Sequence, residues 1–568
     1  MPDPTISHLW KRFWALASPY WRQEEKWKAW GLLALLVILL LGLTRFAVLF
    51  NEQTGEFTSA LAARDEERFW DSIQFCLVLI ITAVPIYALY FYVRDRLGIN
   101  WRQWLTNQFL DSYFSHRHFY ELNAKGGIDN PDQRVAEDIN TFTQRSLYYL
   151  LVIISSLLQL IAFSSVLWSI SSELVYFLVF YALAGTLIVI VVFGKRLMNL
   201  NFNQLRREAD FRFSLVRVRE NAESIAFYRG EPEELRRVKL RFAEAFNNFN
   251  RLIRNQFALN LYQHAFTMLT FVIPSAIIAS RVLSGELEVG HAVQAAGAFA
   301  AVLGAVSLIV ENFEGLSRFA AGVDRLDTLV KSMPKHPTSQ TATTGIIRSV
   351  EASHLALERV TLHTPNHDRI LIRDLSLSIK PNEGLLIVGE SGSGKSSLLR
   401  AIAGLWYSGS GTIFRPKPED ILFLPQQPYM LLGSLRSQLL YPNKAPSTSD
   451  NALLDLLEQV NLPDVARRFG GLDVEMDWHK VLSIGEQQRL AFARLLLTRP
   501  RFAILDEATS ALDAANEESL YRQLVGTRVT LISVSHRPAI LKFHSQVLEL
   551  TGDSHWLSHP AANYRFNH

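Results

Sequence analysis

Long apolar segments alternate with charged segments along the first half of this chain of 568 residues. Six of the apolar segments are long enough to cross a bilayer as helices, which takes about 20 residues each. They lie at 30–50, 73–92, 147–168, 174–193, 265–282 and 291–310. Helices of soluble proteins rarely stay apolar on every side over this length. The pattern therefore predicts an α-helical membrane domain with six transmembrane helices over residues 29–330, rather than six buried helices of a soluble domain.

Two charged, helix-prone stretches separate the spans, at about 94–145 and 195–262. They contain few glycines and prolines, so spans two to five are expected to continue as long cytoplasmic extensions. Glycine and proline, which interrupt helices, are concentrated in GGIDNPD at 126–132 and in YRGEPEE at 228–234. These two segments predict turns between paired helices. Each turn either carries motion from another domain or is a solvated loop, and spacing alone leaves both interpretations open.

The two flanks of the predicted membrane domain differ in composition. Residues 1–28 mix aromatic side chains with lysine and arginine, which predicts a helix lying in the membrane interface, with a frayed tail as the alternative. Residues 331–350 are rich in Pro, Ser, Thr and Lys and predict a flexible linker. Short strands and helices then alternate over 351–568, which predicts an α/β domain built on a mixed sheet.

Composition and charge narrow the function classes. Mean hydropathy is +0.10 although 20% of the residues are charged, as expected when membrane and soluble parts share one chain. A net charge of +3 is too small to indicate a nucleic-acid partner. The single cysteine, Cys76, excludes an intramolecular disulfide and leaves the redox compartment open. The segment 1–28 lacks the apolar core that a cleavable signal peptide needs.

Lysine and arginine are concentrated before the first span and after the second and the fourth, whereas the other loops are acidic or neutral. The basic residues are Lys11, Arg12, Arg22, Lys26, Lys28, Arg94, Arg96, Arg102, Lys195, Arg196, Arg206 and Arg207. The positive-inside rule therefore predicts a cytoplasmic N-terminus, and six spans return the C-terminal domain to the same side. Inside the spans, Arg45, Gln159 and Gln294 either line a polar path or snorkel and bond between helices.

The segment GESGSGKS at 389–396 has the spacing of a phosphate-binding loop. Backbone N–H groups of such a loop turn inward around phosphates, a lysine here reaches the β/γ-phosphates, and the following serine hydroxyl holds Mg²⁺. The sequence therefore predicts ATP and Mg²⁺ as cofactors. The expected nucleotide contacts are Gly389, Glu390, Ser391, Gly392, Ser393, Gly394, Lys395, Ser396 and Ser397, with Ser396 also a metal ligand.

The segment FAILDEATSALD at 502–513 is an apolar strand that ends in two adjacent carboxylates. Asp506 suits the metal, and Glu507 suits a catalytic base that orients the attacking water. Between the two motifs lies VLSIGEQQRLAFARLLL at 481–497. Together the three segments predict ATP hydrolysis by a module that works with a second copy of itself.

These motifs and the six spans resemble ABC transporters, specifically half-transporters whose membrane domain precedes the ATPase. Further stretches are similar to subfamily D, which includes peroxisomal very-long-chain fatty-acyl transporters and bacterial relatives. They are WRQWLT at 101–106, GIDNPDQRVAEDI at 127–139, ESIAFYRGE at 223–231 and LPQQPYMLLGSLRSQLLYP at 424–442. The membrane motifs also resemble bacterial peptide-uptake permeases that lack an ATPase, and bacterial fusions of this kind include a mycobacterial transporter of cobalamin and other hydrophilic solutes. The resemblance covers nearly the whole chain.

The resemblance implies roles for residues outside the two ATP motifs. Gln426 matches the Q-loop glutamine, which senses Mg²⁺ and the membrane domain, and is thus expected at both the metal and the catalytic site. Ser483 and Gly485 match the signature positions that cap the γ-phosphate bound on the partner subunit. Asp513 closes the D-loop, and His536 matches the switch histidine.

Some positions depart from the family pattern or leave a choice. Ile484 and Glu486 stand where the commonest signature has glycine and glutamine. Gln427 is an alternative for the Q-loop glutamine only because it is adjacent to Gln426. The segment LERVTLHTPNHD has Thr364 near the place of the adenine-stacking aromatic residue, so no side chain is assigned to adenine.

The sequence thus predicts ATP-driven transport of a solute across the bacterial inner membrane by a dimeric half-transporter with its ATPase in the cytoplasm. Subfamily D favours uptake of a hydrophilic or amphipathic solute, such as a peptide, a cobalamin-like compound or an acyl compound. Export of a lipid or drug-like compound, and a membrane-anchored regulatory ATPase that moves nothing, are the alternatives. The expected partners are a second copy of the chain (a heterodimer stays open), membrane lipid and the solute, with no nucleic acid.

Overall fold

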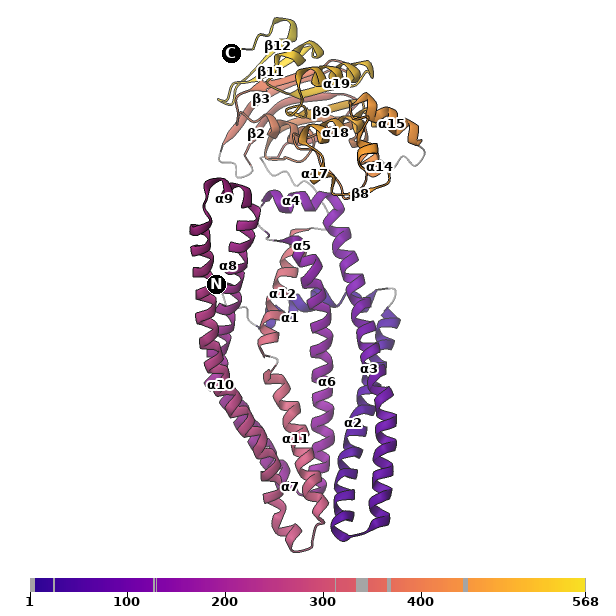
Figure 1. Cartoon of the computed structure of the whole chain (residues 1–568), viewed down its shortest axis with the longest axis vertical. Helices are drawn as coiled ribbons and strands as arrows, with labels where there is room; N and C mark the ends of the chain where they lie inside the picture. Colours follow the sequence, from indigo (N-terminus) through magenta and orange to yellow (C-terminus); the bar gives the residue numbers. More distant parts are fainter. Residues whose placement is uncertain are drawn as a thin grey trace. The chain divides into compact units, whose positions relative to one another are not determined.

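The chain divides into two compact units, Met1–Lys335 and His336–His568, in the computed structural model shown in Figure 1. The structure describes residues 6–23, 26–125, 128, 130–311, 313–333, 346–364, 369–442 and 448–566. Most of the predicted linker at 331–350 lies outside the described residues.

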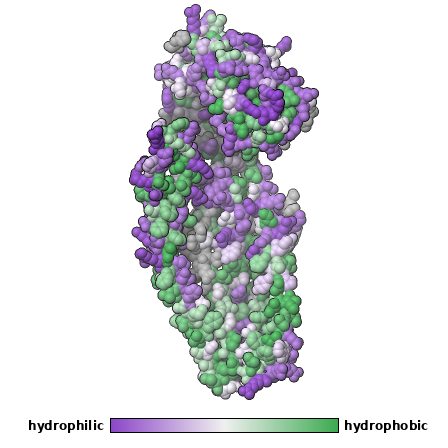
Figure 2. Space-filling model, in the orientation of Figure 1, coloured by the Kyte–Doolittle hydropathy of each residue, from purple (hydrophilic) through white to green (hydrophobic). Residues whose placement is uncertain are grey.

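Within the described residues, six helical stretches of the first unit are long and apolar enough to cross a membrane. They are formed by α2 (Lys26–Ala63), α3 (Glu66–Phe114), α6 (Ile139–Ile170), α7 (Ser172–Ile188) with its π-helical continuation η4 (Val189–Gly194), α10 (Glu231–Leu283) and α11 (Val289–Glu311). Each predicted span lies inside one of them, so the six-helix membrane domain is confirmed. In Figure 2, hydrophobic residues cover most of the surface around α7 and α11, as a lipid-facing surface requires.

The second charged stretch forms a pair of packed helices. The helix α8 (Lys195–Glu220) runs alongside the first half of α10, as Figure 1 also shows. The short helix α9 (Ala222–Tyr228) and Arg229, in the left-handed region at φ 53°, connect the two. The turn therefore falls in YRGEPEE, where the sequence predicts it.

The first charged stretch is less simple than a single turn. After α3 the chain forms η2 (Ser115–Arg117) and α4 (His118–Lys125). Residues 126, 127 and 129 of the predicted turn lie outside the described residues. Asn130, at φ 43°, then precedes the short α5 (Pro131–Gln133), which is followed by the π-helical η3 (Arg134–Asp138) that leads into α6.

The N-terminal helix α1 (Ile6–Ala17) packs against α12 (Phe313–Ser332), the last described helix of the first unit. The ring of Phe13 contacts aromatic rings of α6 and α12, with centroids 5.7 and 6.0 Å away. On another side of α1, Trp10 and Trp14 are exposed. The helix thus has one face against protein and one exposed face.

The second unit is an α/β domain with two main sheets. Its larger sheet has the order β12-β11-β4-β10-β9-β6, and its smaller sheet the order β1-β5-β2-β3. The strands are β1 (Arg348–Glu351), β2 (Leu355–His363), β3 (Ile370–Ile379), β4 (Leu385–Gly389), β5 (Gly409–Arg415), β6 (Ile421–Leu424), β9 (Phe502–Asp506), β10 (Thr530–Val534), β11 (Gln546–Leu550) and β12 (Trp556–Pro560), with a small pair β7 (Gly433–Ser434) and β8 (Glu475–Met476). The predicted α/β nucleotide-binding fold is confirmed.

Helices cover and link these sheets. They are α13 (Lys395–Ile402), α14 (Leu435–Leu440), α15 (Asp450–Gln459), α16 (Val465–Arg468), α17 (Trp478–Val481), α18 (Ile484–Thr498) and α19 (Ala514–Gly526). The strands β4, β10 and β9 are neighbours, run parallel and are almost fully buried. Parallel strands end at the same edge of a sheet, so the loops after these three strands meet there.

Candidate active site

The loop after β4 follows a path that glycine alone adopts without strain. Gly389, Gly392 and Gly394 have φ angles of 145°, 82° and 101°, all in the region that disfavours side chains. A Cβ atom on Gly389 would lie 2.4 Å from the carbonyl oxygen of Leu550, on the neighbouring strand β11. The glycines therefore let the chain leave β4 and enter α13 in a tight loop.

Two polar side chains of this loop fit a bound phosphate. Lys395 is buried, and its Nζ donates to the carbonyl oxygens of Gly389 and Glu390 over 2.7 and 2.8 Å. Burial lowers the pKa of Lys395. The Oγ of Ser393 is buried and, within the described residues, has no hydrogen-bond partner. A buried hydroxyl without a partner and a buried ammonium are the groups that phosphate oxygens would engage.

Two of the three predicted metal ligands, Ser396 and Asp506, lie side by side. The Oγ of Ser396, at the start of α13, donates to Oδ1 of Asp506, at the end of β9, over 3.2 Å. Burial raises the pKa of Asp506 more than the hydrogen bond from Ser396 lowers it. A hydroxyl and a carboxylate are hard oxygen ligands of the kind that Mg²⁺ prefers. The donor set therefore fits the cation that accompanies ATP.

Three segments meet at the carboxylate of Glu507. Its Oε2 accepts a hydrogen bond from Nε2 of Gln426 over 3.2 Å, and its Oε1 lies 3.6 Å from Nε2 of His536. Its own backbone is at φ 48°, and its N–H donates to the carbonyl oxygen of Val534 over 3.1 Å. Positive φ at a non-glycine residue is a conformation that functional sites often hold. The structure thus brings together the three residues that the sequence assigns to catalysis.

The choice between the two neighbouring glutamines has a geometric basis. Gln426 contacts Glu507, whereas the side chain of Gln427 is 3.1 Å from the ring of His479, on α17. Only the first of the two therefore forms a hydrogen bond with the proposed catalytic carboxylate among the described residues.

The signature segment begins α18 with a capping box. Ser483 Oγ accepts from the Glu486 N–H over 3.3 Å, and Glu486 Oε2 accepts from the Ser483 N–H over 2.8 Å. Burial acts to raise the pKa of Glu486, but hydrogen bonds from Ser483 and Arg468 outweigh it and lower the pKa. The glutamate that departs from the commonest signature therefore stabilises the helix start, which is the role of this residue type in a capping box.

Gly485 lies against the loop that follows Glu507. A Cβ atom there would lie 3.1 Å from the carbonyl oxygen of Ala511, so a larger residue would push this loop away. The neighbouring Ile484 is 57% exposed, so its side chain needs no space in the interior. In the described part of the chain, no hydrogen bond joins Ser483 or Gly485 to the phosphate-binding loop of the same chain.

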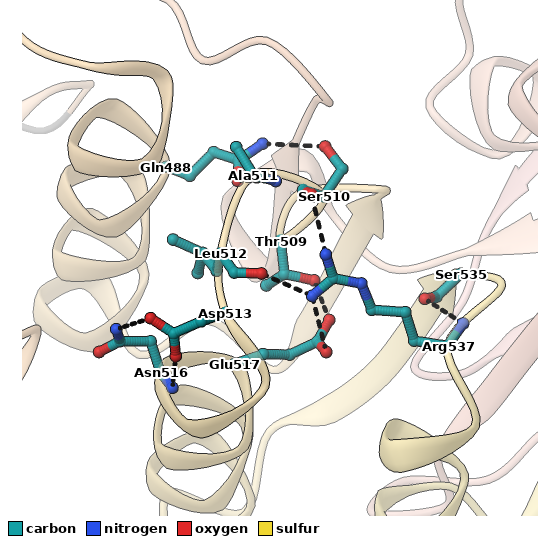
Figure 3. A network of polar contacts seen from close by, with 10 residues as sticks. All are labelled: Gln488, Thr509, Ser510, Ala511, Leu512, Asp513, Asn516, Glu517, Ser535 and Arg537. Carbon is teal, nitrogen blue, oxygen red and sulfur yellow. Dashed lines mark hydrogen bonds and ion pairs between the residues drawn. The ribbon is translucent and has the colours of Figure 1, made fainter.

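Gln488, which is not among the residues predicted from the sequence, joins three parts of the site; Figure 3 shows its contact with the D-loop. It is fully buried in α18, and its Oε1 accepts from the N–H of Ala511 over 3.0 Å. Its Nε2 donates to Ser510 Oγ and to the carbonyl oxygen of Gln426, over 3.2 and 3.0 Å. One amide thus connects the signature helix, the D-loop and the Q-loop. A second glutamine in the run EQQR was the only signal for it.

Asp513 ends the D-loop by capping α19. Its carboxylate accepts hydrogen bonds from the backbone N–H and the side-chain amide of Asn516, over 2.8 and 2.7 Å. These bonds lower the pKa of Asp513. The Asp513 side chain is otherwise exposed to solvent.

The first unit contains a cavity of about 200 Å³ between α7, η4, α10 and α11. It is lined by Gly185, Thr186, Val189, Tyr262, Gln263, His264, Phe266, Thr267, Leu303 and Val306. Among these, Tyr262 donates to the carbonyl oxygen of Gly185 over 3.3 Å, and its ring stacks with that of Phe266. The wall thus combines aromatic rings with amide, imidazole and hydroxyl groups.

The polar residues that sequence analysis singled out within the spans do not line this cavity. Arg45 is exposed on α2, and Gln159 bonds within α6, to Ser155 Oγ over 3.3 Å. Gln294 accepts a hydrogen bond from Asn51 through its backbone carbonyl, 3.1 Å away. The structure therefore supports bonding between helices for Gln294, through its backbone.

Comparison with known proteins follows the division into two units. Residues 21–283 match the family model described as ABC transporter transmembrane region 2, and residues 372–510 match the model described as ABC transporter. An uncharacterized ABC transporter ATP-binding protein of Synechocystis sp. is 47% identical, over 95% of this chain and 83% of its own length. The chloroplastic ABC transporter D family member 2 of Arabidopsis thaliana is 40% identical, over 97% and 88%. The lysosomal cobalamin transporter ABCD4 of Homo sapiens is 32% identical, over 93% of each.

Proposed function

Because this chain belongs to the D subfamily of the ABC transporters and is an ATP-hydrolysing transporter of the membrane, we propose that two copies of it carry a hydrophilic or amphipathic solute across the bacterial inner membrane into the cytoplasm. Half-transporters of this kind carry one ATPase each and generally dimerise. A homodimer is the simplest arrangement, since one chain holds one phosphate loop and one signature.

The single observation that carries the catalytic part of the proposal is the position of the Glu507 carboxylate between Gln426 and His536. In the proposed site, Glu507 orients and deprotonates the attacking water, and His536 donates a hydrogen bond to the transferred phosphate. Ser396, Gln426 and Asp506 hold Mg²⁺, which neutralises charge on the β- and γ-phosphates when it is bound. Lys395 and the loop N–H groups hold the phosphates in place.

The signature residues act on the partner's nucleotide in this proposal. Ser483 and Gly485 cap the γ-phosphate held by the other subunit, and Asp513 lies at the same interface. This arrangement agrees with a capped helix start at Ser483, since the N-terminus of a helix attracts phosphate. It also agrees with the exposure of Asp513 within one chain.

The cavity of the first unit supports an amphipathic solute rather than a purely apolar one. Tyr262 and Phe266 offer aromatic faces, while Thr186, Gln263 and His264 offer hydrogen-bonding groups in the same wall. A peptide, a cobalamin-like compound and an acyl compound with a polar end share this mixed chemistry. One relative, ABCD4, is named a cobalamin transporter, which favours the second of these.

The orientation and the placement at the membrane surface are also proposed. Basic residues before the first span and after the second and fourth favour a cytoplasmic N-terminus and ATPase. The exposed Trp10 and Trp14 support an interfacial position for α1, because tryptophan favours the boundary between lipid and water. Membrane lipid is thus expected to contact both the spans and α1.

Proteoliposomes test function and direction together. ATP added outside energises only the molecules whose ATPase faces outward, so an uptake system should empty preloaded vesicles and an exporter should fill them. Cyanocobalamin, a labelled oligopeptide and a labelled acyl compound are suitable probes, with Glu507→Gln as the inactive control. ATP-dependent filling would replace uptake by export. Hydrolysis that no probe stimulates, with no probe moved in either direction, would favour a regulatory ATPase.

A further inference from the structure

Arg537 directly follows the switch histidine and lies outside the residues given a role above. It stands between β10 and the short helix η6 (Pro538–Phe543), and Figure 3 shows its side chain reaching back over the D-loop. Its own N–H donates to the Oγ of Ser535 over 3.1 Å, which fixes the backbone on the other side of His536. Arg537 thus belongs to a short turn that its hydrogen bond with Ser535 holds in place.

The guanidinium of Arg537 donates to two backbone carbonyls of the D-loop. Its Nη1 donates to the carbonyl oxygen of Leu512 over 2.7 Å, and its Nη2 donates to that of Ser510 over 2.9 Å. Arginine presents several donors in one rigid plane, so it can hold two acceptors at a fixed separation. The D-loop backbone is therefore held in place from the side of the switch turn.

A buried carboxylate completes the contact. Glu517, on α19, is 1% exposed, and its Oε2 accepts from Nη1 of Arg537 over 3.2 Å. Its Oε1 accepts from the hydroxyl of Thr509 over 2.6 Å, at the start of the D-loop. A buried charge needs a partner to be tolerated. Glu517 therefore holds both Arg537 and the D-loop, and it depends on the arginine for its charge balance.

Gln488 binds the D-loop from the side opposite Arg537. Gln488 binds the N–H of Ala511 and the hydroxyl of Ser510 from the signature helix, while Arg537 binds the carbonyls of Ser510 and Leu512. The loop between Glu507 and Asp513 thus has the Ala511 N–H and the Ser510 hydroxyl held from one side, and two backbone carbonyls held from the other. It can shift only together with the switch turn or by breaking these hydrogen bonds.

We propose that Arg537 is a positioning residue for ATP hydrolysis, whose side chain makes the D-loop and the switch histidine move as one body. The inference rests on the proposed roles of Glu507, His536 and Asp513. In this arrangement, contact of Asp513 with a partner subunit sets the place of His536 beside Glu507 through one guanidinium. Loss of the guanidinium leaves nucleotide binding intact and lets the two loops move apart.

The first test is the rate of ATP hydrolysis by the purified full-length protein with Arg537→Lys. A lysine keeps the charge near Glu517 but cannot bind two carbonyls and the carboxylate in one plane. We expect kcat to fall about 10- to 100-fold, as for other small misplacements of reacting groups, with little change in KM for ATP. Arg522→Lys is the matched control, because Arg522 lies on α19 and pairs with the exposed side of that helix, at Glu518. Wild-type kcat in Arg537→Lys would overturn the proposal.

A second test separates positioning from folding. Arg537→Met strands the buried Glu517 carboxylate and should lower the thermal midpoint, so lost activity alone would be ambiguous. The double variant Arg537→Met/Glu517→Gln removes both charges and keeps an acceptor for Thr509. We expect its midpoint to recover while kcat stays low. Recovery of kcat together with stability would show that Arg537 only balances charge, and would overturn the inference.

Glu507→Gln, measured in parallel, separates this inference from the function on which it rests. Full turnover in Glu507→Gln would overturn the proposed catalytic site and this inference with it. Full turnover in the Arg537 variants, with Glu507→Gln inactive, would overturn the inference alone.

Discussion

The side chain of Arg134 donates a hydrogen bond from Nη1 to the backbone carbonyl oxygen of Arg325, over 2.8 Å. Arg325 in turn donates from Nη2 to Oδ1 of Asp138, over 2.5 Å. Arg134 and Asp138 begin and end η3, and each is 6% exposed. The two ends of η3 are thus both hydrogen-bonded to α12, the helix that precedes the ATPase domain in the sequence.

These two hydrogen bonds change the interpretation of the GIDNPDQRVAEDI segment. The sequence predicts a turn here that either carries motion from another domain or is a solvated loop. Asp129 lies outside the described residues, and Asp132 is exposed. Arg134, however, is buried against α12, so its contact is inside the first unit. The hydrogen bond to Arg325 therefore connects Arg134 to α12.

The first prediction concerns Arg134→Ala. We expect ATP hydrolysis to persist and transport to be lost, because α12 keeps only the Arg325–Asp138 contact with η3 and is held less firmly. Removing a buried charged donor also lowers the free energy of unfolding, by about 1–3 kcal/mol. Uptake into or release from proteoliposomes, ATPase rate and thermal midpoint are measured on the same preparation.

Asp132→Ala tests the exposed side of the same turn. A transmission contact there should lose transport with the midpoint unchanged, since an exposed carboxylate contributes within about half a kcal/mol. Normal transport by both Asp132→Ala and Arg134→Ala, at wild-type expression, would reduce the segment to an ordinary loop.

The second prediction is that Glu507→Gln binds ATP but hardly turns it over. Glutamine keeps the size and the hydrogen bond with Gln426 but cannot accept the proton of water. Loss of a general base typically lowers a rate about 10²- to 10⁴-fold. Single-turnover hydrolysis and equilibrium binding of labelled ATP report the two properties separately. Turnover at the wild-type rate would remove Glu507 from the role of base.

Local patterns predicted most residues of the candidate ATP site. The glycines, Lys395 and Ser396 follow from the order of residues in one loop, and Asp506 and Glu507 follow from their place after an apolar strand. Parallel neighbours in the sheet then bring the two segments to one edge. Chemistry that depends on short segments and strand ends can be read from the sequence.

Contacts between distant segments could not be predicted in this way. Gln488 and Arg537 lie 22 to 27 residues from the D-loop atoms that they bind, and Arg134 lies 191 residues from Arg325. Nothing in the local pattern distinguishes these polar residues from solvated neighbours. The residues that line the membrane cavity were missed for a related reason, since hydropathy identifies a span but not which face of it meets another helix.

The third prediction concerns pH. His544 is buried, with Nδ1 2.9 Å from the carbonyl oxygen of Ile540 and Nε2 2.9 Å from the hydroxyl of Ser533. The neutral ring fits both contacts if Nδ1 donates and Nε2 accepts. Burial lowers the pKa of His544 to about 4, below its ordinary value of 6.5.

The sign of the effect follows from which state takes up the proton first. Below pH 6.5 the unfolded chain protonates His544 while the folded domain does not, so stability falls as the pH falls toward 4. The loss between pH 7.5 and 5 is about 2 kcal/mol. Acidic side chains also change charge as the pH falls. The quantity to compare is therefore the change in thermal midpoint with pH, in wild type and in His544→Gln. We expect the thermal midpoint of the wild type to drop more between these pH values. Equal drops in both proteins would contradict a buried neutral imidazole.

The last prediction is that two inactive chains restore activity together. Lys395→Ala disables the phosphate loop, and Ser483→Arg blocks the signature with a long side chain at the capped start of α18. In a homodimer with composite sites, each site takes its phosphate loop from one chain and its signature from the other. A mixed dimer of the two variants therefore has one site with both defects and one site with neither.

Differently tagged variants, co-expressed and purified through both tags, isolate the mixed dimer. We expect ATPase activity well above that of either variant alone, up to about half of the wild-type rate if the two sites turn over independently. The matched control is a dimer of one wild-type chain and one chain that carries both changes. Each of its two sites then contains one defect, so both sites are damaged. If the mixed dimer is as inactive as its parents, or if separated monomers hydrolyse ATP at the full rate, the composite site is wrong.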